Sequence, residues 1–224
     1  MFPDRKQIIE YYQKVLEVND KQGVCCNPLF PENIVPEELA LHSLSTLQPL
    51  SQYRIKPNDR ILDIGCGAGA DCFLAAYSGG SNTRIYGIDT VEDLITRAKF
   101  LKEKYNIPNV EFKSVTPPPL PYEGNCFDLV LMNYSFHIIQ DKAQILSEID
   151  RVLVPGGRAI IADNFTPNEQ IHSTEIENWF MFAGGAISVD DFKLLTNSTN
   201  LTVLDFIQVP ESEIIGYMIC QKKL

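Results

Sequence analysis

Residues 61–69 read Ile-Leu-Asp-Ile-Gly-Cys-Gly-Ala-Gly, so three alternating glycines directly follow a short apolar run. The run at residues 60–64 is typical of a buried parallel strand, and the apolar residues between 72 and 77 indicate a helix after the glycines. Glycine is needed where the backbone adopts a positive φ or approaches a ligand closely, and the free amides at a helix N-terminus favour an anionic group. The segment therefore predicts a strand, turn and helix with a ligand at the turn.

A second acid follows the glycine turn at an informative distance. Residues 84–88 predict another short strand, and Asp89 stands at its end, twenty residues past Gly69. In a doubly wound sheet, an acid at this distance meets the hydroxyl groups of a ribose. The turn and the acid together indicate a site for a nucleotide-like cofactor.

Two cofactor classes fit such a turn. The residues Gly65-x-Gly67-x-x-Ala70 satisfy the loose dinucleotide fingerprint, which is weak support when it stands alone. Asp63 argues against a nicotinamide or flavin dinucleotide as the cofactor, because its carboxylate would lie beside the negative pyrophosphate. S-adenosylmethionine carries a sulfonium, an ammonium and a ribose, which suit both Asp63 and Asp89. The pattern favours S-adenosylmethionine, and a purely structural glycine turn is the remaining alternative.

Length and composition narrow the class of protein. The chain has 224 residues, of which 45% are hydrophobic and 21% charged, so one folded domain is expected. A net charge of −10 argues against a sequence-independent grip on nucleic acid. With no long apolar run, we expect a cytoplasmic chain without a membrane partner, acting as a monomer or homodimer. The six cysteines lack paired zinc spacing and are expected to be reduced thiols, with no bound metal.

Strand and helix patterns alternate along most of the chain, which predicts an α/β, Rossmann-like, doubly wound and mostly parallel sheet of seven strands. Residues 201–209 and 213–221 predict a C-terminal antiparallel pair. Residues 1–50 are expected to form a helical cap and lid on a core of residues 51–224, within a single domain. The expected cap helices are 4–18, with Asp4 as N-cap, and 36–47; the other expected elements are strands 60–64, 84–88, 110–113, 127–132 and 158–163 and helices 70–78, 91–104, 140–152 and 169–182.

Residues 60–163 resemble, in the right order, the motif set of class I S-adenosylmethionine-dependent methyltransferases. The matching motifs are Asp63-x-Gly65-x-Gly67-x-Gly69, Asp89, Phe127-Asp-Leu-Val130 and Arg151-Val-Leu-Val-Pro-Gly-Gly-Arg158. This resemblance implies methyl transfer from S-adenosyl-L-methionine, with S-adenosyl-L-homocysteine as the product. It is specific for the superfamily and uninformative about the acceptor.

The resemblance also implies which residues bind the cofactor. It assigns Asp63 and the glycines to the methionine portion, Asp89 to the ribose hydroxyls and Thr90 to the edge of the adenine. At the end of the third strand, where many members have an acid, this chain offers Ser114 and Val115, so backbone groups are expected to hold the adenine there. The expected cofactor-binding residues are Tyr11, Asp63, Gly65, Cys66, Gly67, Gly69, Asp89, Thr90, Ser114, Val115 and Asn133.

His137 is the candidate general base. It follows the predicted strand at 127–132, so it should lie in the crevice at the carboxyl ends of the strands. Histidine titrates near neutrality, and a base is needed only if the acceptor arrives protonated. The alternative is that His137 hydrogen-bonds the backbone and shapes the pocket.

The first fifty residues carry a second resemblance. A helix with Tyr11 and Tyr12, followed by a loop with Cys25 and Cys26, resembles the N-terminal region of arsenite methyltransferases, and Trp179 resembles part of their later substrate-side segment. On that resemblance, Tyr11 approaches the cofactor and the cysteine loop covers the acceptor. Two further arsenic-ligating cysteines of that family align with Tyr134 and Phe182, and a single vicinal cysteine pair is a thin basis for a three-thiolate site.

These departures favour a small organic acceptor whose nitrogen, sulfur or oxygen nucleophile takes the methyl group by direct displacement. The expected substrate-binding residues are Tyr12, Cys25, Cys26, Tyr134, His137, Trp179 and Phe182. Transfer to thiol-bound arsenic is the first alternative, and in that case Cys25 and Cys26 would be ligands instead of packed hydrophobes. A non-catalytic cofactor-binding protein and a nicotinamide oxidoreductase are more remote alternatives.

Overall fold

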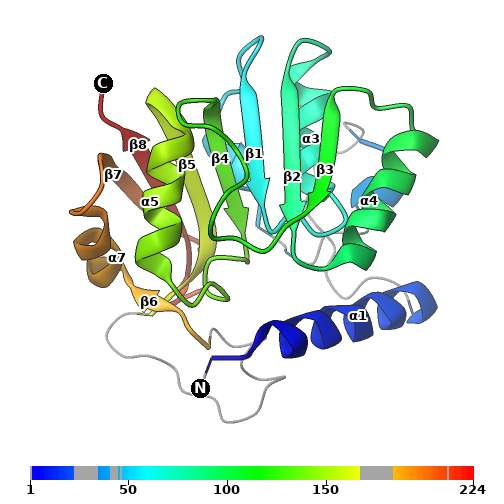
Figure 1. Ribbon diagram of the computed structural model, residues 1–224, viewed down its shortest axis with the longest axis horizontal. Helices are drawn as coiled ribbons and strands as arrows, with labels where there is room; N and C mark the ends of the chain where they lie inside the picture. Colours follow the sequence, from blue (N-terminus) through cyan, green and yellow to red (C-terminus); the bar gives the residue numbers. More distant parts are fainter. Residues whose placement is uncertain (1, 23–34, 41–44, 46, 167–183, 211) are drawn as a thin grey trace.

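The computed structural model of this chain describes residues 2–22, 35–40, 45, 47–166, 184–210 and 212–224. Its strands are β1 (Arg60–Ile64), β2 (Arg84–Asp89), β3 (Val110–Ser114), β4 (Phe127–Asn133), β5 (Leu153–Thr166), β6 (Ile187–Ser188), β7 (Leu201–Gln208) and β8 (Ile215–Lys222). Seven of them form one sheet in the order β3-β2-β1-β4-β5-β8-β7, and the short β6 pairs with β5 (Figure 1). The expected fold class is confirmed.

The strand directions place a topological switch point beside β1. It pairs in parallel with β2 on one side and with β4 on the other, and Asp63 stands opposite Gly87 and Leu131. Strands β5 and β7 both run antiparallel to β8, as expected for the C-terminal pair. Ligands of open parallel sheets bind beyond the carboxyl ends of the strands at such a switch point. The fold therefore directs attention to the ends of β1, β2 and β4.

Helices cover both faces of the sheet. The described helices are α1 (Arg5–Gln22), α2 (Glu37–Ala40), the 3-10 helix η1 (Pro49–Gln52), α3 (Ala70–Gly79), α4 (Glu92–Lys104), α5 (Lys142–Val152) and α7 (Val189–Thr196). One buried hydrophobic cluster joins the sheet to α5 and α7, and a second joins it to α3 and α4. Burial on both faces explains why the central strands are apolar throughout, as parallel strands usually are.

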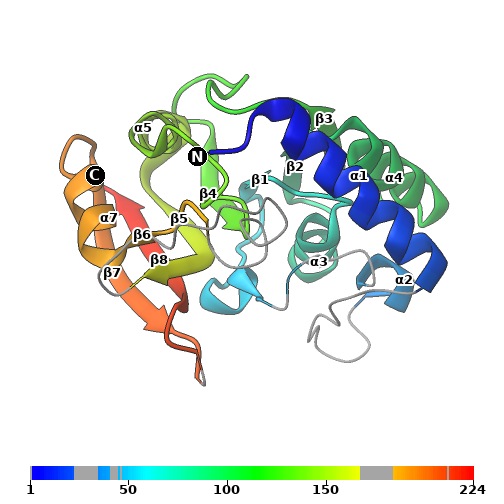
Figure 2. The ribbon, with the colours of Figure 1, turned by 90° about the horizontal axis from the view of Figure 1, so that it is seen from below.

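Helix α1 lies across the edge at which the parallel strands end (Figures 1 and 2). The expected N-cap is confirmed: the Asp4 carboxylate accepts the Gln7 backbone N–H at 2.9 Å, and the Gln7 side chain accepts the Asp4 N–H in return. Along its length, Ile9, Tyr12 and Leu16 pack on a small cluster that includes Leu94 of α4. Packing on α4 therefore holds the cap helix over the carboxyl edge of the sheet.

The expected helix at 36–47 is wrong in its extent. Helix α2 covers only Glu37–Ala40 in the described residues, and Ser45 and Leu47 lie outside any helix. The Ser45 hydroxyl accepts the Leu47 backbone N–H at 2.9 Å, which is a local alternative to helical hydrogen bonding. Pro49 follows, and the residue before a proline is driven out of the helical region, as Gln48 is with φ −126° and ψ 80°.

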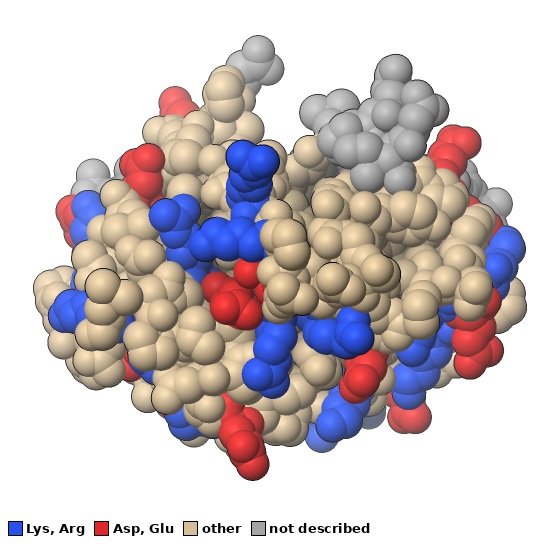
Figure 3. Space-filling model, turned by 90° about the horizontal axis from the view of Figure 1, so that it is seen from above, with Lys and Arg blue, Asp and Glu red and all other residues tan. Residues whose placement is uncertain are grey.

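Two further differences concern the C-terminal part. Helix α7 was not expected, although Ser188 accepts the Asp191 N–H at 3.0 Å as an N-cap, and the Ser-x-x-Asp spacing was visible in the sequence. The expected helix at 169–182 lies outside the described residues. None of the described helices combines the length and apolar character needed to cross a membrane. On the face in Figure 3, acidic side chains lie among the lysines and arginines.

Candidate functional site

A cavity of about 1030 Å3 lies at the carboxyl edge of the sheet, beneath α1. Its walls come from α1, from the ends of β1, β2 and β4, and from the loops that follow these strands. It brings together most of the described residues that the sequence analysis selected, namely Tyr11, Tyr12, Asp63, Gly65, Cys66, Gly67, Asp89, Thr90, Asn133, Tyr134 and His137. Residues as far apart in sequence as Tyr11 and His137 thus share one site.

The remaining selected residues lie elsewhere. Gly69 caps α3 outside the cavity wall, and Ser114 and Val115 are replaced in the wall by their neighbours Thr116 and Pro117. The other four, Cys25, Cys26, Trp179 and Phe182, lie outside the described residues.

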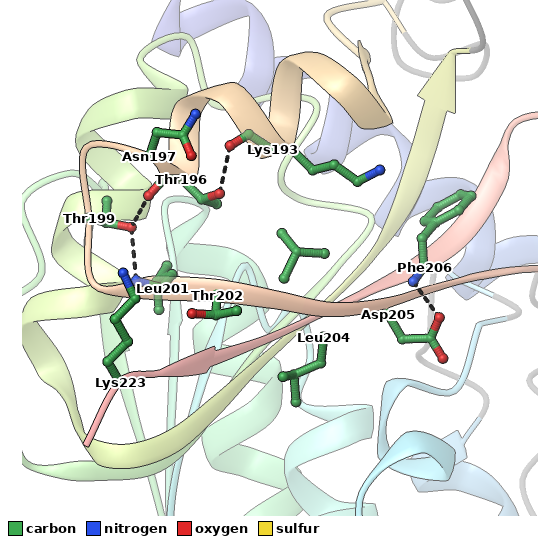
Figure 4. A pocket seen from close by; sticks show the side chains of 11 residues that line it. Lys193, Thr196, Asn197, Thr199, Leu201, Thr202, Leu204, Asp205, Phe206 and Lys223 are labelled. Carbon is green, nitrogen blue, oxygen red and sulfur yellow. Dashed lines mark hydrogen bonds between the residues drawn. The ribbon is translucent and has the colours of Figure 1, made fainter.

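A second hollow, of about 670 Å3, lies between α7 and β7 (Figure 4). Its hydroxyl groups are engaged locally: Thr196 donates to the Lys193 carbonyl at 2.8 Å, and Thr199 accepts the Leu201 N–H at 3.0 Å. None of the residues selected from the sequence lines it. The cavity under α1 is therefore the candidate site.

The glycines of the turn serve three different purposes. Gly65, Gly67 and Gly69 all have positive φ, at 78°, 55° and 92°. A Cβ at Gly65 would lie 2.4 Å from the Ser135 Cβ, and one at Gly69 would lie 2.6 Å from the Phe112 ring. A Cβ at Gly67 would meet nothing within 4 Å, so this residue leaves the cavity open to a ligand.

Asp89 is tied to the glycine turn by its own carboxylate. Its Oδ2 accepts the Gly67 N–H and its Oδ1 accepts the Val91 N–H, both at 2.9 Å. Burial raises the pKa of Asp89, and these backbone hydrogen bonds act in the opposite direction. A carboxylate offers about four lone-pair sites, so Asp89 has room beyond its backbone donors for a further one, such as a ligand hydroxyl.

Asp63 presents a buried carboxylate to the cavity. It is 1% exposed, and its Oδ2 is 3.4 Å from the Cys72 thiol, while its Oδ1 accepts no hydrogen bond from the described residues. Burial, and then the neighbouring carboxylate of Asp71, raise its pKa well above the usual range. The pKa of Asp71 is itself raised to about 6 by burial. A positively charged ligand would stabilise the ionised forms of Asp63 and Asp71, because its charge offsets the desolvation of the two carboxylates and their mutual repulsion.

Asn133 connects the cap to this acidic wall. Its Nδ2 donates to Asp71 Oδ2 at 2.8 Å and to the Leu47 carbonyl at 3.1 Å, and its Oδ1 accepts the Ser45 hydroxyl at 2.8 Å. The two sides of the amide are therefore engaged, one with the start of α3 and the other with residues 45–47. The end of β4 anchors the cap segment beside the cavity.

His137 also lines the cavity and is 1% exposed. Its Nδ1 is 2.8 Å from Oδ1 of Asp163, a residue in β5. Tyr134, which precedes it with a φ of 52°, places its ring centroid 6.2 Å from that of His137. The sequence analysis did not select Asp163, although an acid at the end of the expected strand 158–163 was a usable signal.

The sequence matches a known protein family over most of the described sheet. A family model described as a methyltransferase domain matches residues 55–205, which is more than half of the chain. The chain belongs to this methyltransferase domain family.

Individual relatives of this methyltransferase domain act on different acceptors. The chain is 29% identical over 158 residues to an arsenite methyltransferase of Halobacterium salinarum, covering 70% of this chain and 40% of the relative. It is 33% identical over 127 residues to a 2-phytyl-1,4-naphtoquinone methyltransferase of Trichormus variabilis, covering 56% of this chain and 55% of the relative. The chain thus spans about half the length of these curated relatives.

Solved structures agree on the fold of the methyltransferase domain. The geranyl diphosphate C-methyltransferase of Streptomyces coelicolor, solved with S-adenosyl-L-homocysteine, superposes with a TM-score of 0.72 at 15% identity, and the match covers 98% of each chain. At this identity the likeness concerns the fold alone.

Lys142, at the start of α5, supports the segment that carries His137. It is buried, and its ammonium donates to the carbonyls of Ile139 at 2.8 Å and His137 at 3.3 Å and lies 5.4 Å from the centre of the Phe136 ring. Burial lowers its pKa to about 8, and the charge of Asp163 acts in the opposite direction. The sequence analysis did not select this residue either.

We expect the stability of this protein relative to its Lys142→Met variant to rise with pH. The folded protein releases the Lys142 proton near pH 8, whereas the unfolded chain keeps it until about pH 10.5, so the unfolded state binds more protons in between. The unfolding free energy of the wild type minus that of the variant should increase by roughly 2–3 kcal/mol between about pH 7 and about pH 10. Urea unfolding of both proteins measures it, and a difference that stays flat with pH would contradict the lowered pKa.

Proposed function

We propose that this chain is an S-adenosyl-L-methionine-dependent methyltransferase acting on a small organic acceptor with a nitrogen, sulfur or oxygen nucleophile. The observation that carries the proposal is the buried Asp63 carboxylate: this residue lines the cavity together with the bare backbone of Gly67, and its Oδ1 accepts no hydrogen bond from the described residues. A carboxylate in this position suits an ammonium or sulfonium group and disfavours a pyrophosphate.

The residues of the cavity fit the cofactor in three respects. Gly67 would let the backbone approach the methionine portion, and Asp63 would face its positive charge. Asp89 would accept the ribose hydroxyls on the lone pairs that its backbone hydrogen bonds leave available. For the adenine, Thr116 and Pro117 line the wall after β3, which supports contacts through backbone groups.

The bound cofactor supplies a methyl group on a positively charged sulfur, which is already activated for displacement. The task of the protein is therefore to align the acceptor and exclude water. Helix α1 contributes Ile8, Tyr11 and Val15 to the cavity wall and would shield the reacting atoms from solvent. Such positioning supplies up to about 7–11 kcal/mol of the barrier reduction.

An organic acceptor is favoured over thiol-bound arsenic by the described part of the cavity. Among its described lining residues, Cys66 is the sole cysteine, and burial raises its pKa to about 11, which disfavours the thiolate that a soft ion requires. Tyr134 lines the cavity where the arsenite family was expected to place a cysteine. The similarity to a quinone methyltransferase supports the same choice.

The finer expectations belong to the same proposal. Residues 1–50 form a cap on a single methyltransferase domain, and the protein is cytoplasmic. It acts as a monomer or homodimer without a nucleic-acid or membrane partner.

A titration and a product screen test the proposal. We expect S-adenosyl-L-homocysteine to bind in isothermal calorimetry, whereas NADH should give no heat of binding. Labelled S-adenosyl-L-methionine is then incubated with amines, imidazoles, thiols, phenols and arsenite, and methylated products are read by mass spectrometry. Methylated arsenic would favour the alternative acceptor, binding without any product would favour a non-catalytic protein, and binding of NADH alone would refute the cofactor.

A further inference from the structure

Both carboxylate oxygens of Asp163 take part in hydrogen bonds with the segment that carries His137. Its side chain is fully buried, and its Oδ2 accepts the backbone N–H groups of Phe136 at 2.8 Å and His137 at 3.0 Å. Its Oδ1 accepts the Asn164 N–H at 2.7 Å and lies 2.8 Å from His137 Nδ1. Three backbone donors therefore point at one carboxylate, an arrangement that suits a group whose oxygens accept hydrogen bonds.

These contacts determine the tautomer of His137. Because an ionised Asp163 can only accept hydrogen bonds, His137 Nδ1 must carry a hydrogen and donate it. In the neutral imidazole the lone pair then lies on Nε2. His137 is one of the residues that line the cavity, and the two amide contacts to Oδ2 fix the peptide that bears this ring.

We propose that Asp163 is a positioning residue that holds His137 as a general base, and that the acceptor is therefore an O–H acid such as a phenol or an enol. This inference rests on the proposed methyltransferase function and deepens it. The proton of the acceptor hydroxyl moves to His137 Nε2, and both electrons of the O–H bond remain on the oxygen, which becomes the nucleophile. The carboxylate of Asp163 then stabilises the imidazolium.

An acceptor that is already nucleophilic has no use for this pair. A pyridine-type nitrogen carries its lone pair at neutral pH, and thiol-bound arsenic has no proton on the attacking atom. A phenol with a pKa near 10, by contrast, is mostly protonated at neutral pH and needs a base in the transition state.

Charged and aromatic side chains surround the pair of His137 and Asp163. Lys142 of α5 donates to the His137 carbonyl, and the negative charge of Asp163 favours the charged form of this lysine. From α1, Tyr12 is also within the influence of Asp163, and its pKa is raised mainly by burial. Tyr134 packs edge-on against the imidazole.

The tautomer is measured directly by nitrogen-15 NMR of the histidine rings. The sequence has three histidines, and the His137 signals are assigned with His137→Gln. In the wild type we expect Nδ1 to carry the hydrogen. In Asp163→Asn the two backbone donors on Oδ2 favour the side-chain oxygen at that position, so the NH2 group takes the place of Oδ1, faces Nδ1 and should shift the hydrogen to Nε2. A wild type protonated on Nε2, or an unchanged tautomer in Asp163→Asn, would overturn the inference.

Activity provides the second readout. With simple phenols as probes, Asp163→Asn and His137→Gln should each lower turnover by roughly 100-fold or more, while the affinity for S-adenosyl-L-homocysteine changes less than about threefold. If Asp163→Asn does not fold, the wild-type tautomer and His137→Gln still decide the question. Methylation of pyridine-type nitrogens or arsenite but not of phenols would overturn the acceptor class and leave the methyltransferase function standing, whereas failure of S-adenosyl-L-homocysteine to bind the wild type would refute that function itself.

Discussion

Gly67→Val is expected to abolish S-adenosyl-L-homocysteine binding while leaving the fold intact. At Gly67 a Cβ meets nothing within 4 Å, because the position faces the cavity. The two methyl groups of valine would occupy the space that a close backbone approach leaves for the ligand. The φ of 55° makes valine cost roughly 1–2 kcal/mol, which is well below the usual stability of a domain.

The affinity for S-adenosyl-L-homocysteine should fall by at least about 100-fold, or about 2.7 kcal/mol, in a calorimetric titration. Gly80→Val is the matched control, because Gly80 also has a positive φ of 74° and an open Cβ position, yet lies at the end of α3 outside the cavity wall. Its backbone conformation disfavours valine at least as strongly. We expect the control to bind S-adenosyl-L-homocysteine normally. Equal losses of affinity in the two variants would mean that backbone strain, and not occupation of the cavity, causes the loss.

The sheet was predictable from sequence because its signals are local. The first two parallel strands are short and largely apolar, the third alternates apolar and polar residues, and the Gly-x-Gly turn and Asp89 lie next to the strands that position them. The extent of the second cap helix was not predictable from its apolar pattern, because a Ser45 hydroxyl and Pro49 together compete with helical hydrogen bonding.

The chemistry of the site was only partly predictable, since its deciding contacts join distant residues. His137 was selected from the sequence, but its partner Asp163 was not. Asp163 lies 26 residues further along the chain, and the sequence alone does not show that its carboxylate meets His137. Lys142 reads as a solvent-exposed first residue of a helix, although it is buried beneath the loop that it supports. Asn133 was expected to contact the cofactor, and its amide hydrogen-bonds Ser45, 88 residues away. Such pairings depend on the sheet order, which brings β4 and β5 together.

Gly65→Ala is expected to destabilise the whole domain, in contrast to the change at Gly67. The new Cβ would lie 2.4 Å from the Ser135 Cβ and 2.8 Å from its hydroxyl oxygen, at a φ of 78°. Ser135 cannot move away freely, because its hydroxyl donates to the Ile64 carbonyl at 2.6 Å. Backbone strain and overpacking together should cost about 3 kcal/mol of unfolding free energy in urea denaturation.

A second change at Ser135 separates the steric clash from the backbone strain. Ser135→Gly removes the Cβ that the alanine meets, so the double variant Gly65→Ala/Ser135→Gly should be more stable than the sum of the two single changes by roughly 1–2 kcal/mol. Ser135→Ala keeps that Cβ and removes only the hydroxyl, so it should give little rescue. If both double variants recover equally, the contact with the hydroxyl oxygen dominates. If neither recovers, the left-handed backbone alone makes glycine necessary at this position.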